Sequence, residues 1–165
     1  MDDSRSATSY FDQHRPRVTA VIPVLKAMSG ELLAQVGEEQ LRALFRATGV
    51  QIGESYPVGK IERLGELEQV AQTWLAANDW GWLKIEHHED AVDFVHGDSP
   101  LVAWFGEAAM GWSSALFEGL YAAWIRQLGA DERLQLRQVR QADRPVQELR
   151  YRLSHESRFT QQAGG

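Results

Sequence analysis

The apolar pattern of the chain changes its period at residue 78, and this change constrains the fold more than any other feature. Between residues 22 and 77 apolar side chains recur every three or four positions, the spacing of helices that bury one face. Residues 82–88 and 91–96 are instead rich in β-branched and aromatic side chains around a short polar connection, which predicts an antiparallel hairpin. The chain therefore has to pack amphipathic helices against at least one hairpin.

The same patterns divide the rest of the chain into elements. Helices are predicted over residues 22–36, 38–52, 61–77 and 110–128, and strands over residues 82–88, 91–96, 134–139 and 146–153. Residues 101–105 are ambiguous between helix and strand, and the alternation slips between Leu136 and Val139, which predicts a β-bulge. Because the strands come in adjacent pairs, we expect an α+β fold of about four helices with a four-stranded antiparallel sheet.

Length and composition favour a single domain. A chain of 165 residues with 44% apolar residues can bury roughly two thirds of its unfolded surface around one core. Residues 1–16 are polar and are interpreted as a flexible N-terminal arm, residues 17–153 as the α+β domain, and residues 154–165 as a flexible C-terminal tail.

One face of the predicted helix 110–128 carries only small residues. Gly111, Ala115, Gly119 and Ala123 recur every four positions along it. Such a row lets another backbone approach closely, and glycine inside a helix costs about 1 kcal/mol relative to alanine, which suggests an offsetting contact. The contact is either with another element of the same chain or with a second copy, so these four residues are also the candidate oligomer interface.

The chain offers no recognisable set of catalytic residues. His87, His88, Glu89, Asp90 and His96 are residue types that bind zinc, but neighbours on a strand point to opposite faces, which favours a solvated turn and a partly buried His96. No carboxylate pair is placed for glycoside hydrolysis, no serine lies in a nucleophile turn, and there is no cysteine. We expect no catalytic, cofactor-binding or metal-binding residues; a small-ligand sensor built on His96 and the aromatic helix is an alternative.

Aromatic residues are the other candidates for a binding role. The chain has six tryptophans and four tyrosines, whose flat rings are surfaces on which sugars stack. Most tryptophans fall in predicted elements and are expected in the core. Trp104 lies in the ambiguous segment, and Tyr10 and Phe11 lie in the arm, so these three are the candidates for a surface contact. Docking on the parent fold is the simpler interpretation of each ring taken alone.

The charge of the chain is unevenly distributed. Residues 126–158 hold eight arginines and five acidic residues, while the remainder holds nine basic and eighteen acidic residues, for a formal net charge of −6. This polarity favours contact between copies over nucleic-acid binding, which needs a broad basic surface, although a chance distribution would look similar. No window approaches the roughly 18 apolar residues of a membrane span, and the first residues lack the pattern of a secretory signal, so cytoplasmic residence is expected.

Three sequence blocks resemble the D protein of bacterial cellulose synthase operons. The blocks are Asn78 with Trp80-Gly81-Trp82-Leu83-Lys84, then Val95-His96 with Asp98 and Pro100, then Leu116-Phe117-Glu118-Gly119-Leu120-Tyr121 with Trp124-Ile125. In element order the resemblance covers roughly residues 20–153.

The resemblance implies a non-catalytic accessory protein that builds ring-like octamers from dimers. Such rings help to order nascent β-1,4-glucan or to align synthase complexes for the export of crystalline cellulose. The implied partners are copies of the chain itself and other proteins of the operon. In an alternative, the chain is a glucan guide in which Tyr10 and Phe11, with Trp104, contact glucan along a passage. The ring would act either in the cytoplasm or in the periplasm, and the N-terminal residues favour the cytoplasm.

Overall fold

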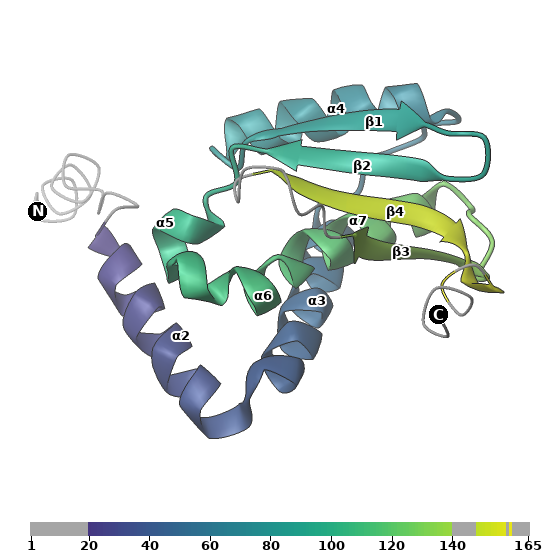
Figure 1. Ribbon diagram of the computed structural model, residues 1–165. Helices are drawn as coiled ribbons and strands as arrows, with labels where there is room; N and C mark the ends of the chain where they lie inside the picture. Colours follow the sequence, from purple (N-terminus) through teal and green to yellow (C-terminus); the bar gives the residue numbers. More distant parts are fainter. Residues whose placement is uncertain (1–19, 140–147, 158, 160–165) are drawn as a thin grey trace, which may run out of the picture.

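The computed structural model describes residues 20–139, 148–157 and 159, and within them helices surround one face of a sheet (Figure 1). The helices are α2 (Ile22–Val36), α3 (Glu38–Ser55), α4 (Leu64–Ala77), α5 (Leu101–Phe105), the 3₁₀ turn η2 (Glu107–Ala109), α6 (Met110–Ser113) and α7 (Ala115–Gln127). The strands are β1 (Trp82–His87), β2 (Val92–Gly97), β3 (Leu134–Val139) and β4 (Leu149–His155).

The four strands form one sheet in the order β1-β2-β4-β3, and every neighbouring pair is antiparallel. The two hairpins therefore meet through β2 and β4, where Phe94 lies opposite Tyr151, and β1 and β3 are the two edges. The predicted α+β class and the four-stranded antiparallel sheet are confirmed. The assembly of copies into a ring stays a prediction.

The core lies between the sheet and the two helices that cross behind it in Figure 1, α4 and α7. Alternate residues of each strand face these helices, as the period of two requires; Phe94 and Tyr151 on the central strands are fully buried. Helix α7 contributes most of the remaining core, including Phe117 and Tyr121. Because α7 is packed on one side by the sheet and on another by α3, ten of its thirteen residues are buried.

Local chemistry explains the boundaries of the first helices. Pro23 stands in the first turn of α2, where its missing N–H costs nothing. Gly37 then takes a φ of 83°, a conformation suited to glycine, and this single residue separates α2 from α3. Glu38 and Glu39 follow in the first turn of α3 and complement its dipole. The two helices consequently diverge as a V (Figure 1).

Two predicted elements differ from those observed. The helix predicted over 110–128 is interrupted at Ser114, whose hydroxyl donates to Gln138 and whose carbonyl oxygen accepts from the Tyr151 hydroxyl. The bulge predicted in β3 is wrong, because β3 and β4 pair without interruption from Leu134 to Val139. The slip in the pattern arises because Gln138, a polar residue, occupies a core-facing position and bonds inside the protein.

The remaining differences lie at element ends. Residues 101–105, ambiguous in sequence, form the short helix α5, and α4 begins at Leu64, three residues later than predicted. Strand β4 continues through Ser154 and His155, two residues into the range predicted as a tail. The connection expected between β3 and β4, around Asp143, Arg144 and Pro145, lies outside the described residues.

Candidate functional site

Helices α3 and α7 touch backbone to backbone through facing glycines. A Cβ atom placed on Gly119 of α7 would lie 1.9 Å from the carbonyl oxygen of Arg46, and one placed on Gly49 of α3 would lie 1.9 Å from the carbonyl oxygen of Leu116. A Cβ on Gly53 would meet the Ala123 side chain at 2.7 Å. No side chain fits at the three glycine positions, so the small residues exist to let the two helices approach.

This junction accounts for most of the predicted small-residue row. Ala115, Gly119 and Ala123 are buried against α3 of the same chain, and Gly111, which is half-buried, lies beside the Glu38 side chain. Of the two partners considered for the row, the structure has the intrachain one. A second copy could contact the three buried residues only by displacing α3, so an assembly surface has to be sought elsewhere. The four-residue spacing of Gly49 and Gly53 was the available signal for the facing helix.

A buried carboxylate, Glu118, joins three elements beside this junction. Its oxygens accept hydrogen bonds from Arg42 Nη2 at 2.7 Å, from Arg46 Nε at 3.1 Å and from the Gln138 backbone N–H at 3.1 Å. Arg42 also donates to the Gly111 carbonyl oxygen at 3.1 Å. Glu118 therefore fixes α3 and β3 to α7. Nothing in the spacing of the sequence indicated the two arginines or Gln138 as its partners.

The other polar groups of the last helices are also used internally. Ser113 and Ser114 are fully buried, and the Ser114 hydroxyl donates to Gln138 Oε1 at 2.7 Å. Neither serine has a histidine partner in the hydrogen bonds of the described residues, whereas a nucleophile needs an adjacent base. This network holds elements together and leaves no reactive group exposed.

His96 is a core residue rather than a surface ligand. It is fully buried, its ring lies over that of Phe117 with 3.8 Å between centroids, and its Nδ1 shares a hydrogen bond with the Tyr121 hydroxyl. Burial lowers the pKa of His96 to about 3, and a backbone hydrogen bond to Trp80 offsets part of that effect. The ring is thus neutral at physiological pH and packs as an aromatic side chain.

The histidines of the first hairpin do not join His96. His88 lies on the opposite side of the sheet, where its Nε2 is 3.2 Å from Asp93 Oδ2. Burial alone would raise the pKa of Asp93, but the guanidinium groups of Arg152 and Arg150 hold it below the usual value. Within the described ranges, no three histidine, aspartate or glutamate side chains gather as a metal-binding group. Asp93 is instead the centre of an ion-pair cluster.

The first resemblance block forms a close turn beside β2. A Cβ on Gly81, where φ is 90°, would lie 2.1 Å from the Gly97 carbonyl oxygen, so only glycine fits. The Trp82 ring covers Gly97, and its Nε1 donates to Asp98 Oδ2 at 2.9 Å. The residues of this block are therefore used for packing.

The three predicted sugar-contacting aromatics have different outcomes. Trp104 lies in α5, half-buried, with its ring 5.5 Å from that of Trp80 in an edge-on arrangement and packed against the core. Tyr10 and Phe11 lie outside the described residues. The structure does not bring Trp104 into a described binding cavity, and a glucan contact at these residues stays a prediction.

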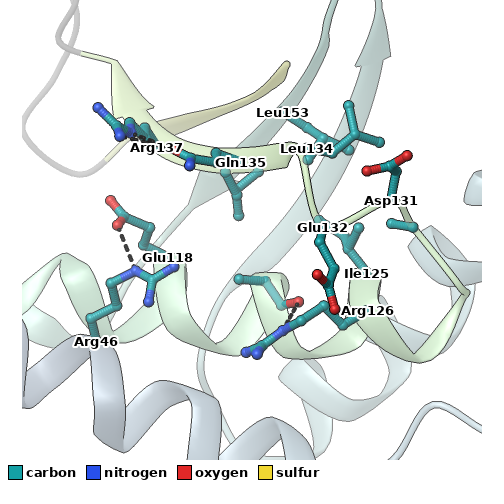
Figure 2. Close-up of a pocket in the computed structure, with 13 residues that line it drawn as sticks. Arg46, Glu118, Ile125, Arg126, Asp131, Glu132, Leu134, Gln135, Arg137 and Leu153 are labelled. Atoms are coloured by element: carbon teal, nitrogen blue, oxygen red, sulfur yellow. Dashed lines mark hydrogen bonds and ion pairs between the residues drawn. The ribbon is translucent and has the colours of Figure 1, made fainter. Parts of the chain in front are cut away.

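Two open features remain on the surface. Helix α2 buries only Ser29 and leaves Val24 and Met28 more than half exposed, next to Leu44 of α3. A cavity of about 490 Å³ lies between α7 and the edge strand β3 (Figure 2). Its lining residues are Arg46, Glu118, Ala122, Ile125, Arg126, Ala130, Asp131, Glu132, Leu134, Gln135, Leu136, Arg137 and Leu153. The lining has an apolar floor and a rim of both charges, without histidine or cysteine.

None of the helices in the described part of the chain combines the length and the apolar character needed to cross a bilayer. The arrangement offers surfaces for contact and a packed interior, and it presents no nucleophile and base in hydrogen-bond reach among the described residues.

Comparison with known proteins identifies the family. The family of the cellulose synthase D protein, a subunit of the synthase, matches residues 7–152 of the chain. Cellulose synthase operon protein D of Komagataeibacter xylinus is 32% identical over 103 residues, which is 61% of this chain and 66% of the relative, and the protein of the same name from Komagataeibacter sucrofermentans gives the same values. The chain thus spans about two thirds of the length of these curated relatives. It belongs to the family of cellulose synthase D proteins.

Proposed function

We propose that the chain is a non-catalytic accessory subunit of cellulose biosynthesis that acts by assembling with copies of itself into a scaffold for synthase complexes. Family membership supports the link to cellulose biosynthesis. The observation that carries the assembly step is the exposed apolar surface of α2.

An isolated helix of the length of α2 is marginal in water and normally gains its stability by packing an apolar face. Here only Ser29 of its fifteen residues is buried, while Val24 is 54% and Met28 55% exposed. Leu44 of α3 adds to the same apolar surface with 51% exposure. A contiguous exposed apolar surface on a soluble protein marks an interaction site, so we expect a partner to cover α2.

A second copy fits this surface. Ala27, Gly30 and Ala34 lie together on the outward side of α2 at spacings of three and four, and all three are exposed. A Cβ on Gly30 would touch nothing in its own chain, so the cost of a mid-helix glycine has no offset within the described residues. Close approach of α2 from a second copy would supply that offset and would bury Val24 and Met28, as a two-fold interface does with one patch used twice.

The test is the particle mass of a variant with charge in the α2 surface. Met28→Glu should shift the mass measured by native mass spectrometry from an oligomer towards the monomer, because a buried unpaired carboxylate opposes association. Gln69→Glu is the matched control, since it adds the same charge to an exposed position of α4. A Met28→Glu variant that keeps the mass of the unaltered protein contradicts the role of α2.

The same variants connect assembly to cellulose production. If spatial arrangement of copies is what the protein contributes, Met28→Glu should fail to restore crystalline cellulose to cells that lack the protein, while Gln69→Glu should restore it. A monomeric variant that restores normal fibres would overturn the scaffold function itself.

The location and the glucan contact are tested separately. Fractionation of cells, with marker proteins for cytoplasm and periplasm, tests the expected cytoplasmic residence. Quenching of tryptophan fluorescence by cello-oligosaccharides, compared between the full chain and a Trp104→Phe variant, tests the glucan contact. Loss of the quenching in the variant would favour a guiding role.

A further inference from the structure

The two edges of the sheet are finished differently. On β1, the backbone N–H of Leu83 donates to Gln72 Oε1 at 3.0 Å, and that of Ile85 donates to Glu68 Oε2 at 2.5 Å. Both acceptors are side chains of α4, which packs along β1. An edge strand presents unpaired groups to any passing strand, and covering them is a standard protection. The β1 edge is closed in this way.

The β3 edge is open at its centre. Leu134, Leu136 and Gln138 direct their backbone groups away from β4, because such groups alternate along an antiparallel strand and Arg133 is bonded on the β4 side. The N–H of Leu134 donates to the Asp131 carbonyl oxygen at 2.9 Å, and that of Gln138 to Glu118 at 3.1 Å. The N–H of Leu136 has no acceptor among the described residues.

A cavity of about 490 Å³ lies directly beside this open edge. Ala122 and Ile125 of α7 line it on one side, and Leu134 and Leu136 of β3 line it on the other (Figure 2). A new strand next to β3 would lie about 4.8 Å from it, with alternate side chains directed towards the apolar lining. The cavity therefore provides room and an apolar floor for one more strand.

Charge on the outer face of the sheet specifies one residue of that strand. Glu86, Asp93, Arg152 and Arg137 lie opposite one another across the four strands in that order. Asp93 bonds Arg152 through both of its oxygens, but Arg137 donates only to Gln135 and stacks on the Phe159 ring at 5.0 Å, with no acidic partner among the described residues. An acidic residue in the next strand would complete the row, because opposite charges stabilise directly facing strand positions.

We infer that the open edge of β3 binds an extended peptide strand from another protein, with apolar side chains over the cavity and an acidic side chain facing Arg137. Peptides commonly bind by adding a strand to an exposed sheet edge. A second β3 is a poor occupant, since residues 134–139 contain no acidic residue to face Arg137. The inference goes beyond the assembly of copies and does not depend on it.

The test uses a defined probe on the full chain. The probe is a capped heptapeptide of alternating valine and glutamate, and its matched control replaces glutamate with lysine. At low salt the glutamate peptide should bind at least tenfold more tightly than the lysine peptide. When it saturates the protein, exchange of the Leu136 amide hydrogen, followed by NMR, should slow at least tenfold. An unchanged Leu136 exchange rate at millimolar peptide would overturn the inference.

Two variants locate the site. Arg137→Glu should reverse the preference towards the lysine peptide, whereas Lys84→Glu, which makes the same charge change on the closed β1 edge, should leave the preference unaltered. Ala122→Trp fills the cavity from a partly exposed position on α7 and should weaken binding of the glutamate peptide at least tenfold. Equal effects of Arg137→Glu and Lys84→Glu would show non-specific attraction and would overturn the inference.

One further outcome separates a foreign strand from a second copy. If the Leu136 amide is already protected without peptide and becomes exchangeable on dilution, copies of the chain pair through β3, and the inference is wrong. The Met28→Glu variant distinguishes this result from assembly through α2, because it should leave peptide binding at β3 unchanged.

Discussion

Helices α2 and α3 follow one another with a single residue between them, yet the protein uses them in opposite ways. Both show the three-and-four apolar spacing of an amphipathic helix. Helix α3 presents Gly49 and Gly53 to α7 and comes into backbone contact with it, while α2 buries one residue and exposes its valines and methionine. The comparison teaches that periodicity identifies an apolar face and that the surrounding structure decides whether the chain itself covers it.

The largest expected effect is at the tight junction. Gly119→Val should lower the free energy of unfolding by at least about 4 kcal/mol, because a side chain there meets the Arg46 carbonyl oxygen and has no flexible neighbour to displace. Denaturant unfolding followed by tryptophan fluorescence measures the loss. A change below about 1 kcal/mol would mean that α3 and α7 can separate without cost, and the contrast with α2 would fail.

The second effect concerns acid and again belongs to the packed half of the molecule. Because the pKa of His96 is about 3 when folded and about 6.5 when unfolded, the unfolded chain gains a proton as the pH falls below 6.5 and the folded chain does not. The loss of stability due to His96 should reach about 3 kcal/mol at pH 4.

The measurement for His96 is the slope of unfolding free energy against pH. Between pH 4 and 6, His96→Phe should remove close to one proton from that slope, whatever the acidic residues contribute. Equal slopes for the variant and the unaltered protein would contradict the neutral, buried state of His96. Helix α2 offers a contrast, since its only buried residue is Ser29, which does not titrate.

The smallest effect tests α2 directly. In a monomeric background, Gly30→Ala should raise the free energy of unfolding by about 0.5–1 kcal/mol, because alanine favours the helix and its Cβ meets nothing. Gly49→Ala, the matched change in α3, should destabilise instead, since its Cβ would lie 1.9 Å from the Leu116 carbonyl oxygen. Denaturation curves of the two variants measure the opposite signs.

The oligomer sharpens this last prediction. If α2 contacts a second copy at Gly30, the alanine should weaken association at the same time as it stabilises the monomer. Analytical ultracentrifugation of Gly30→Ala at several concentrations measures that balance. A stabilised monomer with unaltered association would place the contact between copies away from Gly30.

The sequence was informative where a pattern is set by local geometry. The two hairpins, the long helices and the small-residue row on α7 could all be predicted, since each depends on spacing along one element. The bulge in β3 was predicted wrongly because Gln138 is polar yet faces inward, and its partners Arg42 and Ser114 come from other parts of the chain. The resemblance blocks pointed to the correct family, although their residues serve packing in the described structure.

What the sequence determined by itself is the class of fold, because hydrophobic period and turn chemistry act over a few neighbouring residues. The tertiary structure decided which surfaces meet. It placed Gly119 against α3 of the same chain, joined Arg42 and Arg46 to Glu118, and left α2 and the β3 edge open. These outcomes depend on contacts between residues about 70 positions apart, and packing in three dimensions, unlike period, has no counterpart in the spacing of a single element.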